Sequence, residues 1–107
     1  MSDVLRVLLV GDIVGRPGRE ALKKVVGAWR KEDRADFVIA NGENSAGGKG
    51  ITAETTREMI AAGVDVVTGG NHVWANKDIL KVIDTEPRLL RPANYPPGVP
   101  GRGHGVY

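Results

Sequence analysis

Five residues in three short clusters carry side chains that could bind metal ions or transfer protons. Asp12 follows one apolar run, Glu43 and Asn44 follow a second, and Asn71 and His72 follow a third. Carboxylates, carboxamides and imidazole together suit divalent transition-metal ions, and a carboxylate has two oxygens with which to bridge two ions. We therefore interpret these five residues as a candidate metal-binding and catalytic site.

The apolar runs before these clusters are predicted to be β-strands. They cover residues 4–10, 35–40 and 64–68 and are rich in valine, leucine and isoleucine. The first is nearly continuous, which predicts a strand buried on both faces. Ligands bind beyond the carboxyl ends of the strands in an open parallel sheet, so this arrangement would bring the three clusters to one rim.

Amphipathic segments separate the strands and complete a βαβαβα order. After a turn at residues 15–18, the first predicted helix has an apolar stripe made of Ala21, Leu22, Val25, Val26 and Trp29. Thr52 is a predicted cap for a second helix that runs through Met59 and Ile60 and stops near Gly63. Asn76 would cap a third, whose buried side is Ile79, Leu80, Val82 and Ile83. The expected fold is α/β, with a parallel sheet and helices on its faces.

Glycine is the unusual feature of the composition. The chain has 15 glycines in 107 residues, about twice the usual share of roughly 7%, and glycines accompany all three clusters. Glycine permits sharp turns and close approach of a ligand. The spacing of Gly11, Gly15 and Gly18 is not the dinucleotide-binding fingerprint, and Asp12 would repel a pyrophosphate. Because Asp12 is negatively charged, a cation is the better match for it. No Walker A sequence is present either.

A structural interpretation competes with the functional one. Asp and Asn are common in turns and helix caps, and His72 could be a packed histidine with one ring nitrogen bonded to a carbonyl. Agreement among three strand ends favours the functional interpretation. His104 lies in a Pro/Gly-rich stretch and is interpreted as an incidental polar residue. Trp29 and Trp74 are interpreted as packing residues and Lys49 as a solvated loop charge.

Overall composition narrows the class of protein. The chain is 41% hydrophobic and 26% charged, with a net charge of +2 and no cysteine. Neither a membrane span nor strong nucleic-acid binding is indicated. The absence of cysteine and of a secretory leader pattern favours a cytoplasmic protein. We expect one partial domain, with the βαβαβα core in residues 1–86 and a connecting segment in 87–107, where prolines and glycines exclude regular structure beyond Arg88–Leu90.

Five segments resemble the calcineurin-like metallophosphoesterase superfamily, and within it the YmdB-type branch of bacterial cyclic-nucleotide phosphodiesterases. These segments are Val10–Gly18 (VGDIVGRPG), Ala40–Thr52 (ANGENSAGGKGIT), Gly69–Trp74 (GGNHVW), Arg91–Pro96 and Pro100–Gly103. The resemblance covers essentially the whole chain. It implies that the sheet is the N-terminal half of a metallophosphoesterase α/β sandwich.

The resemblance also implies roles for the five residues. Asp12 and Asn44 would bind one divalent ion, Asn71 a second, and Glu43 would bridge both ions, which could be Fe, Mn or Zn. His72 would protonate the leaving oxygen of a phosphodiester such as 2′,3′-cyclic AMP. Val14 replaces the first histidine of the superfamily pattern, and Glu43-Asn44 replaces its usual Gly-Asp, as in the YmdB-type branch.

The family supplies three further histidine ligands in its second half, and this sequence lacks the segments that carry them. We therefore expect half of a binuclear centre here, with weak or no turnover by these 107 residues alone. Two alternatives stay open. The chain could be a non-catalytic flavodoxin-like module that binds phosphate or nucleotide, or it could pair with a second polypeptide or a second copy through an exposed strand edge.

Overall fold

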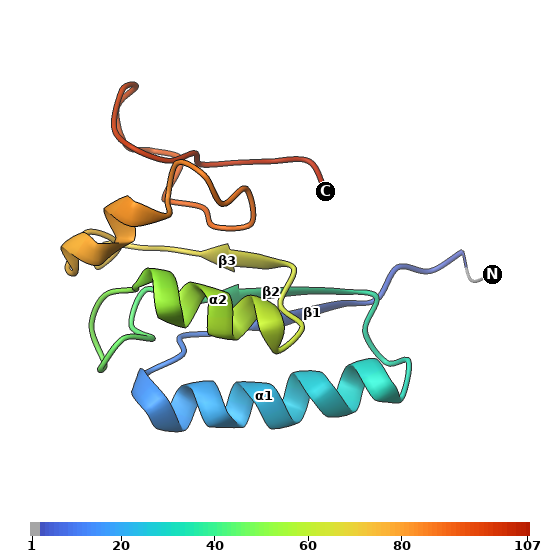
Figure 1. Cartoon of the computed structure of the whole chain (residues 1–107). Coiled ribbons are helices and arrows are strands. Elements are labelled where there is room, and N and C mark those ends of the chain that lie inside the picture. The colour runs from blue at the N-terminus through green and yellow to red at the C-terminus, as the bar shows by residue number, and fades with distance from the viewer. Residues whose placement is uncertain (1–2) are drawn as a thin grey trace.

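The protein is an α/β structure with a three-stranded parallel sheet, and the computed structural model describes residues 3–107. Figure 1 shows the elements in chain order. They are β1 (Val7–Val10), α1 (Gly15–Lys31), β2 (Phe37–Asn41), α2 (Ala53–Ala61), β3 (Val66–Thr68) and a short 3₁₀ helix, η1 (Lys77–Lys81). The predicted α/β class and parallel sheet are confirmed, although a 3₁₀ helix stands where a third α-helix was expected.

The strands lie in the sheet in chain order, β1-β2-β3. Val7 is paired with Phe37, and Ile39 with Val66. The flavodoxin-like alternative is therefore wrong for the fold, because that fold places its first strand between the second and third. Beyond β3, Leu89 forms a parallel bridge with Val67. The strand pairing thus extends into the predicted connecting segment. It does so at Arg88–Leu90, the one place in that segment where regular structure was expected.

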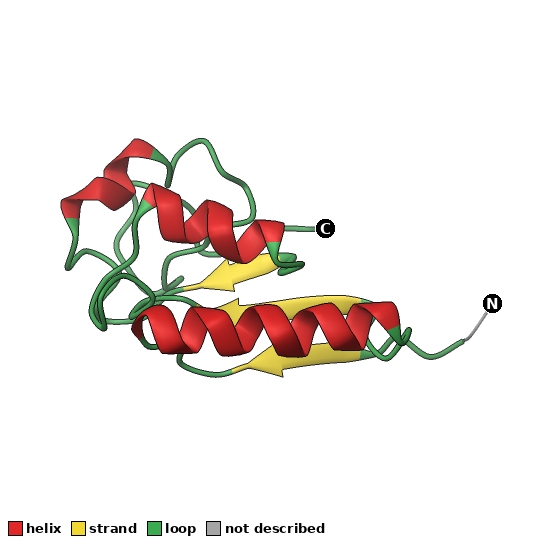
Figure 2. Ribbon diagram, turned by 60° about the horizontal axis from the view of Figure 1, so that its bottom comes forward, coloured by secondary structure: helices red, strands yellow, loops and turns green. Residues whose placement is uncertain are grey.

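Both helices lie against the same face of the sheet (Figure 2). The prediction that the first strand is buried on both faces is wrong. Leu9 is 71% exposed and Val7 is 45% exposed, and both lie on the face that the helices do not cover. The physical reason is the strand order, since successive right-handed crossovers that advance in one direction place their helices on one side.

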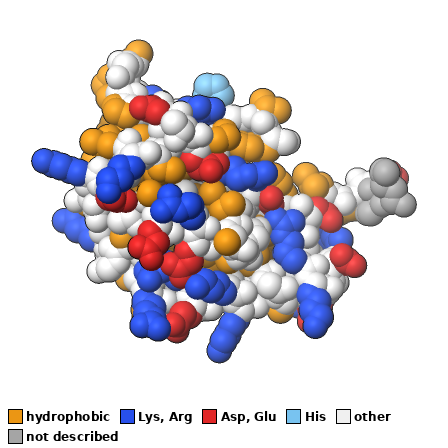
Figure 3. All heavy atoms as spheres, in the orientation of Figure 1, with side chains coloured by type: hydrophobic (Ala, Val, Ile, Leu, Met, Phe, Trp, Pro, Cys, Tyr) orange, Lys and Arg blue, Asp and Glu red, His pale blue; other side chains and the backbone are white. Residues whose placement is uncertain are grey.

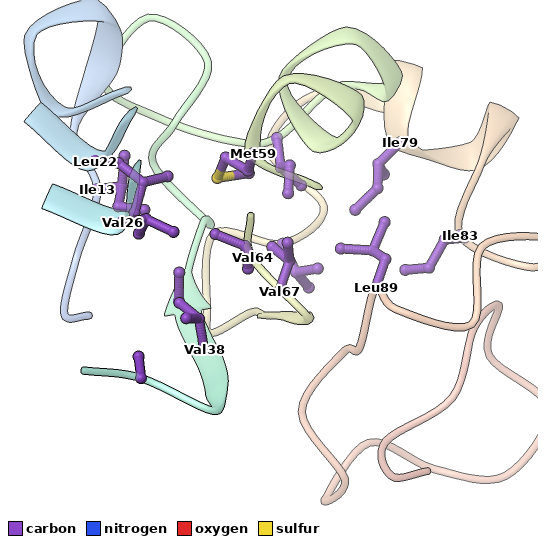
Figure 4. Packing of buried hydrophobic residues seen from close by; sticks show 14 residues of the cluster. Ile13, Leu22, Val26, Val38, Met59, Val64, Val67, Ile79, Ile83 and Leu89 are labelled. Carbon is purple, nitrogen blue, oxygen red and sulfur yellow. The ribbon is translucent and has the colours of Figure 1, made fainter. Parts of the chain in front are cut away.

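The hydrophobic core lies between the sheet and this single helical layer (Figure 4). Leu22 and Val26 of α1 pack into it with Val38 of β2 and Met59 of α2. Helix α1 begins at Gly15, so the predicted turn at residues 15–18 is its first turn. Val25 is 44% exposed and Ala21 is also exposed, so the buried stripe is narrower than predicted. Trp29 and Trp74 pack against the core from its margin, as expected.

Capping residues define where the helices begin. The Thr52 hydroxyl accepts a hydrogen bond from Thr55 N, and the Thr55 hydroxyl accepts one from Thr52 N, which confirms the predicted start of α2. The Asn76 side chain accepts from Asp78 N and caps η1. Ile79 and Ile83 are buried as predicted, whereas Leu80 is 52% exposed, because a 3₁₀ turn presents a different side from an α-helix.

The surface is polar over the helices. Positive and negative side chains are mixed on the face seen in Figure 3. Within residues 3–107, no helix is long and apolar enough to cross a membrane.

Candidate functional site

Backbone hydrogen bonds join the loops that follow the three strands, at the left of the sheet in Figure 1. Ile13 N donates to Asn41 O at 3.1 Å, Gly42 N to Thr68 O at 3.0 Å, and Gly15 N to Asn44 O at 3.0 Å. These bonds continue the sheet pairing past the strand ends. The carboxyl ends of all three strands therefore form one rim.

Four of the five candidate side chains are linked on that rim. Asn44 Nδ2 donates to Asp12 Oδ1 at 2.9 Å, and Asn44 Oδ1 lies 2.7 Å from His72 Nδ1. The His72 backbone N–H donates to Glu43 Oε2 at 2.8 Å. Side chains from three separate loops thus meet, with the Asn44 amide at the centre.

Solvent exposure of the candidate residues increases from the centre of the site to its margin. Asn44 is 9% exposed, while the side chains of Glu43 and His72 are 14% and 36% exposed. Asp12 and Asn71 are exposed. Asn71 adjoins His72 in the chain, but none of the hydrogen bonds above includes it, so the structure brings four candidates together and leaves the fifth at the edge.

Gly70 is required by the position of Glu43. A Cβ built at residue 70 would lie 2.7 Å from Glu43 Oε2 and would overlap Oε1. The space that this glycine keeps free is therefore filled by a carboxylate of the site itself. At the end of β1, by contrast, a Cβ on Gly11 would meet no atom within 4 Å.

Two groups that sequence reasoning missed hold the loop that carries Glu43 and Asn44. The Ser45 hydroxyl is fully buried and donates to Gly42 O at 2.7 Å. Arg19 of α1 donates to Ser45 O and, at 3.0 Å, to Glu58 Oε2 of α2. Because Arg19 and Glu58 lie 39 residues apart, their pairing leaves no local pattern in the sequence.

Charge also supports this junction of the two helices. Lys23 Nζ lies 2.7 Å from Glu58 Oε1. The hydrogen bond from Lys23, together with the charge of Arg19, lowers the pKa of the Glu58 carboxyl below its ordinary value. Glu58 therefore stays ionised and keeps α1, α2 and the Gly42–Ser45 turn together near neutral pH.

The rim is open to solvent at Asp12 and Asn71, which are both exposed. Two surface pockets, of about 620 Å³ and 550 Å³, lie elsewhere. The larger one separates the start of α2 from η1, and the smaller one lies beside Gly63 and Arg88. Neither is lined by any of the five candidate residues.

The donor atoms on the rim fit divalent cations. Carboxylate and amide oxygens of Asp12, Glu43 and Asn44 lie on the rim with His72, and hard oxygen ligands of this kind suit Mn²⁺. Across residues 3–107, no three His, Asp or Glu side chains group closely enough to hold a metal ion without help from amides. Amide oxygens of this chain, and further ligands from outside these 107 residues, would have to complete the set.

This chain is similar in sequence and in structure to known proteins. The chain is 46% identical to the 2′,3′-cyclic-nucleotide 2′-phosphodiesterase of Bacillus subtilis (strain 168) over 99 residues, which are 92% of this chain and 38% of that protein. A crystal structure of a hypothetical protein from Thermus thermophilus superimposes with a TM-score of 0.85 at 45% identity, over 92% of this chain and 38% of that one.

A crystal structure described as a novel phosphatase of Mycoplasma pneumoniae also superimposes with a TM-score of 0.85, at 32% identity, over 96% of this chain and 38% of that one. The chain thus spans about two-fifths of the length of the relatives it matches. The family model described as YmdB-like protein matches residues 8–107. This match covers nearly the whole sheet and the candidate site, and the chain belongs to the YmdB-like family.

Proposed function

We propose that this chain forms part of a metal-dependent phosphodiesterase whose substrates are cyclic nucleotides of the 2′,3′-cyclic AMP type. The observation that carries the proposal is the linkage of Asp12, Asn44 and His72, with Glu43 held beside them, where three strands end. The name of the Bacillus subtilis relative supports the substrate class. Its length supports the view that the remaining ligands come from outside these 107 residues.

Each residue has a distinct proposed role. Asp12 and Asn44 would hold one divalent cation, Asn71 a second, and the two oxygens of Glu43 would contact both. Two bound cations would supply Lewis-acid polarisation of the phosphate and activation of a water molecule. His72, which has a partly exposed ring beside these ligands, would donate a proton from Nε2 to the leaving oxygen.

The Asn44 amide would link cation binding to the orientation of the His72 ring. Its Oδ1 faces His72 and its Nδ2 faces Asp12. An amide nitrogen does not ligate a cation, so Asn44 must offer Oδ1 to share a cation with Asp12. The amide nitrogen would then face His72 Nδ1 and favour the ring tautomer that carries its proton on Nε2.

A chimaera tests the proposal directly. This chain would replace the matching 38% of the Bacillus subtilis phosphodiesterase, and hydrolysis of 2′,3′-cyclic AMP would be measured with Mn²⁺. We expect turnover that falls at least about 100-fold with Glu43→Gln. Lys31→Gln, which alters an exposed residue at the end of α1 farthest from the rim (Figure 1), is the control and should retain turnover.

Unchanged turnover in the Glu43→Gln chimaera would overturn the proposed role of Glu43. Calorimetry tests the alternative of a binding module without catalysis. That alternative would be favoured if the 107-residue chain bound the nucleotide with equal affinity in the presence of a chelator and after Asp12→Asn.

A further inference from the structure

We infer that Asn41 is a positioning residue that sets the orientation of the Glu43 carboxylate. Asn41 Nδ2 donates to Glu43 Oε1 at 3.4 Å, and Asn41 Oδ1 accepts from the Glu43 backbone N–H at 3.3 Å. Both ends of one amide therefore contact one residue. The inference rests on the proposed function, because it assigns Asn41 a task only if Glu43 contacts cations.

The other carboxylate oxygen is held from the opposite strand end. The His72 N–H donates to Glu43 Oε2 at 2.8 Å, and Gly70 leaves the room that the carboxylate occupies. Each oxygen of an ionised carboxylate can accept about two hydrogen bonds. With one bond from the chain on each oxygen, one acceptor site on each stays free, which is what a carboxylate that bridges two cations requires.

Asn41 is well placed for this task because it belongs to a strand and not to a loop. It is the last residue of β2, and its backbone is paired with Thr68 of β3. Its carbonyl accepts from Ile13 N at 3.1 Å. The backbone is thus fixed from both sides, and the side chain starts from a defined point two residues before Glu43.

The length of the two Asn41 contacts indicates what they do. Bonds of 3.3 and 3.4 Å are longer than the usual 2.7–3.2 Å and contribute little to the stability of the fold. Their effect is on direction, since rotation of the carboxylate would break one of them. Loss of Asn41 should therefore weaken cation binding far more than folding.

The test uses Mn²⁺ as the probe and the chimaera described above, which supplies the ligands that lie outside these 107 residues. Mn²⁺ is titrated while NMR follows the paramagnetic broadening of amide signals around residues 12, 43 and 72. We expect Asn41→Ala to weaken Mn²⁺ binding about 10-fold, within the range seen when a partner of a metal ligand is removed. The midpoint of thermal unfolding of the metal-free protein should stay close to that of the wild type.

Asn41→Asp tests whether the change in cation affinity is a gain or a loss. It keeps the acceptor for Glu43 N–H and replaces the donor by an oxygen that repels Glu43 Oε1. Added negative charge alone would strengthen cation binding, whereas loss of positioning weakens it, so we expect weaker binding than in the wild type. Lys31→Gln makes the net charge more negative by the same amount at the far end of α1 and should leave binding unchanged.

The results distinguish failure of the role of Asn41 from failure of the proposed metal centre. Site-specific broadening in the wild type with no loss in Asn41→Ala, or tighter binding by Asn41→Asp, would overturn the role of Asn41 and leave the proposed function standing. Absence of site-specific broadening in the wild type would overturn the metal centre and, with it, the role of Asn41. In metal-free protein, the Asn41 side-chain amide signal should shift on Glu43→Gln, and an unmoved signal would also overturn the inference.

Discussion

The first strand is more exposed to solvent than the second and third. In β1, Val7 and Leu9 are 45% and 71% exposed, whereas Val38 of β2 and Val67 of β3 are fully buried. The same contrast continues past the strand ends. Gly11 has open space around it, while Gly70 is packed against the Glu43 carboxylate.

This contrast divides the candidate site into two parts. Glu43 and His72 come from the buried side, where backbone bonds and close contacts fix them. Asp12 comes from the exposed side and is joined to the rest by a side-chain bond from Asn44. The buried side thus fixes Glu43 and His72, and the proposed ligand Asp12 is joined to them through the Asn44 amide.

The largest expected effect separates the two sides by stability. Val38→Ala removes two methyl groups from a fully buried position and should cost about 1.5–3 kcal/mol of unfolding free energy. Val7→Ala makes the same change in β1 and should cost about 0.5 kcal/mol or less. Urea denaturation of both variants measures the difference. Equal losses would mean that the outer face of β1 is covered in solution.

A glycine pair tests the contrast at the strand ends. Gly70→Ala should displace the Glu43 carboxylate and weaken Mn²⁺ binding about 10-fold, while Gly11→Ala should leave binding as it is. The NMR titration with Mn²⁺ serves for both variants. Equal affinity in Gly70→Ala and Gly11→Ala would show that Glu43 does not need the space above residue 70.

A smaller effect concerns the ion pairs between α1 and α2. The pKa of Glu58 is lowered in the folded protein, so its contribution is present above the unfolded pKa of about 4.3 and is lost as pH falls through the lower folded value. Glu58→Gln should cost about 1 kcal/mol at pH 7.

Near pH 2, Glu58→Gln and the wild type should have converged in stability, as measured by urea denaturation at each pH. Glu20→Gln is the control, because Glu20 forms an exposed pair with Arg16 on the same helix. It should show no measurable loss at either pH. A constant difference between Glu58→Gln and the wild type from pH 7 to pH 2 would contradict the role of the Glu58 charge.

Local patterns were enough to predict the strands and the caps. The alternation of apolar runs with amphipathic segments predicted the order of elements, and Thr52 and Asn76 marked helix starts because their side chains bond to backbone N–H groups nearby in sequence. The same patterns could not assign faces to the sheet. A continuous apolar run such as residues 4–10 does not reveal how many layers cover it, so the exposure of Leu9 was missed.

The candidate site was predictable as a set of residues but not as a geometry. Strand ends with hard ligands are visible in the sequence, and four of the five side chains do meet. The support around them was not visible, because Gly70 and Glu43 lie on different loops and Arg19 reaches a residue in another helix. Asn41 had a local signal that was overlooked, since an Asn two residues before a backbone donor is a common turn arrangement.

The chain-order arrangement of the strands has a consequence for synthesis on the ribosome. Each strand pairs with the one made immediately before it, and the residues around Leu89 add to β3 in the same way. Among the strands in residues 3–107, none must be inserted between two that already exist. At translation rates of about 5–20 residues per second, each βα unit has seconds in which to dock before the next emerges. The sheet can therefore grow outward from β1 as a nascent chain, in one direction and without rearrangement.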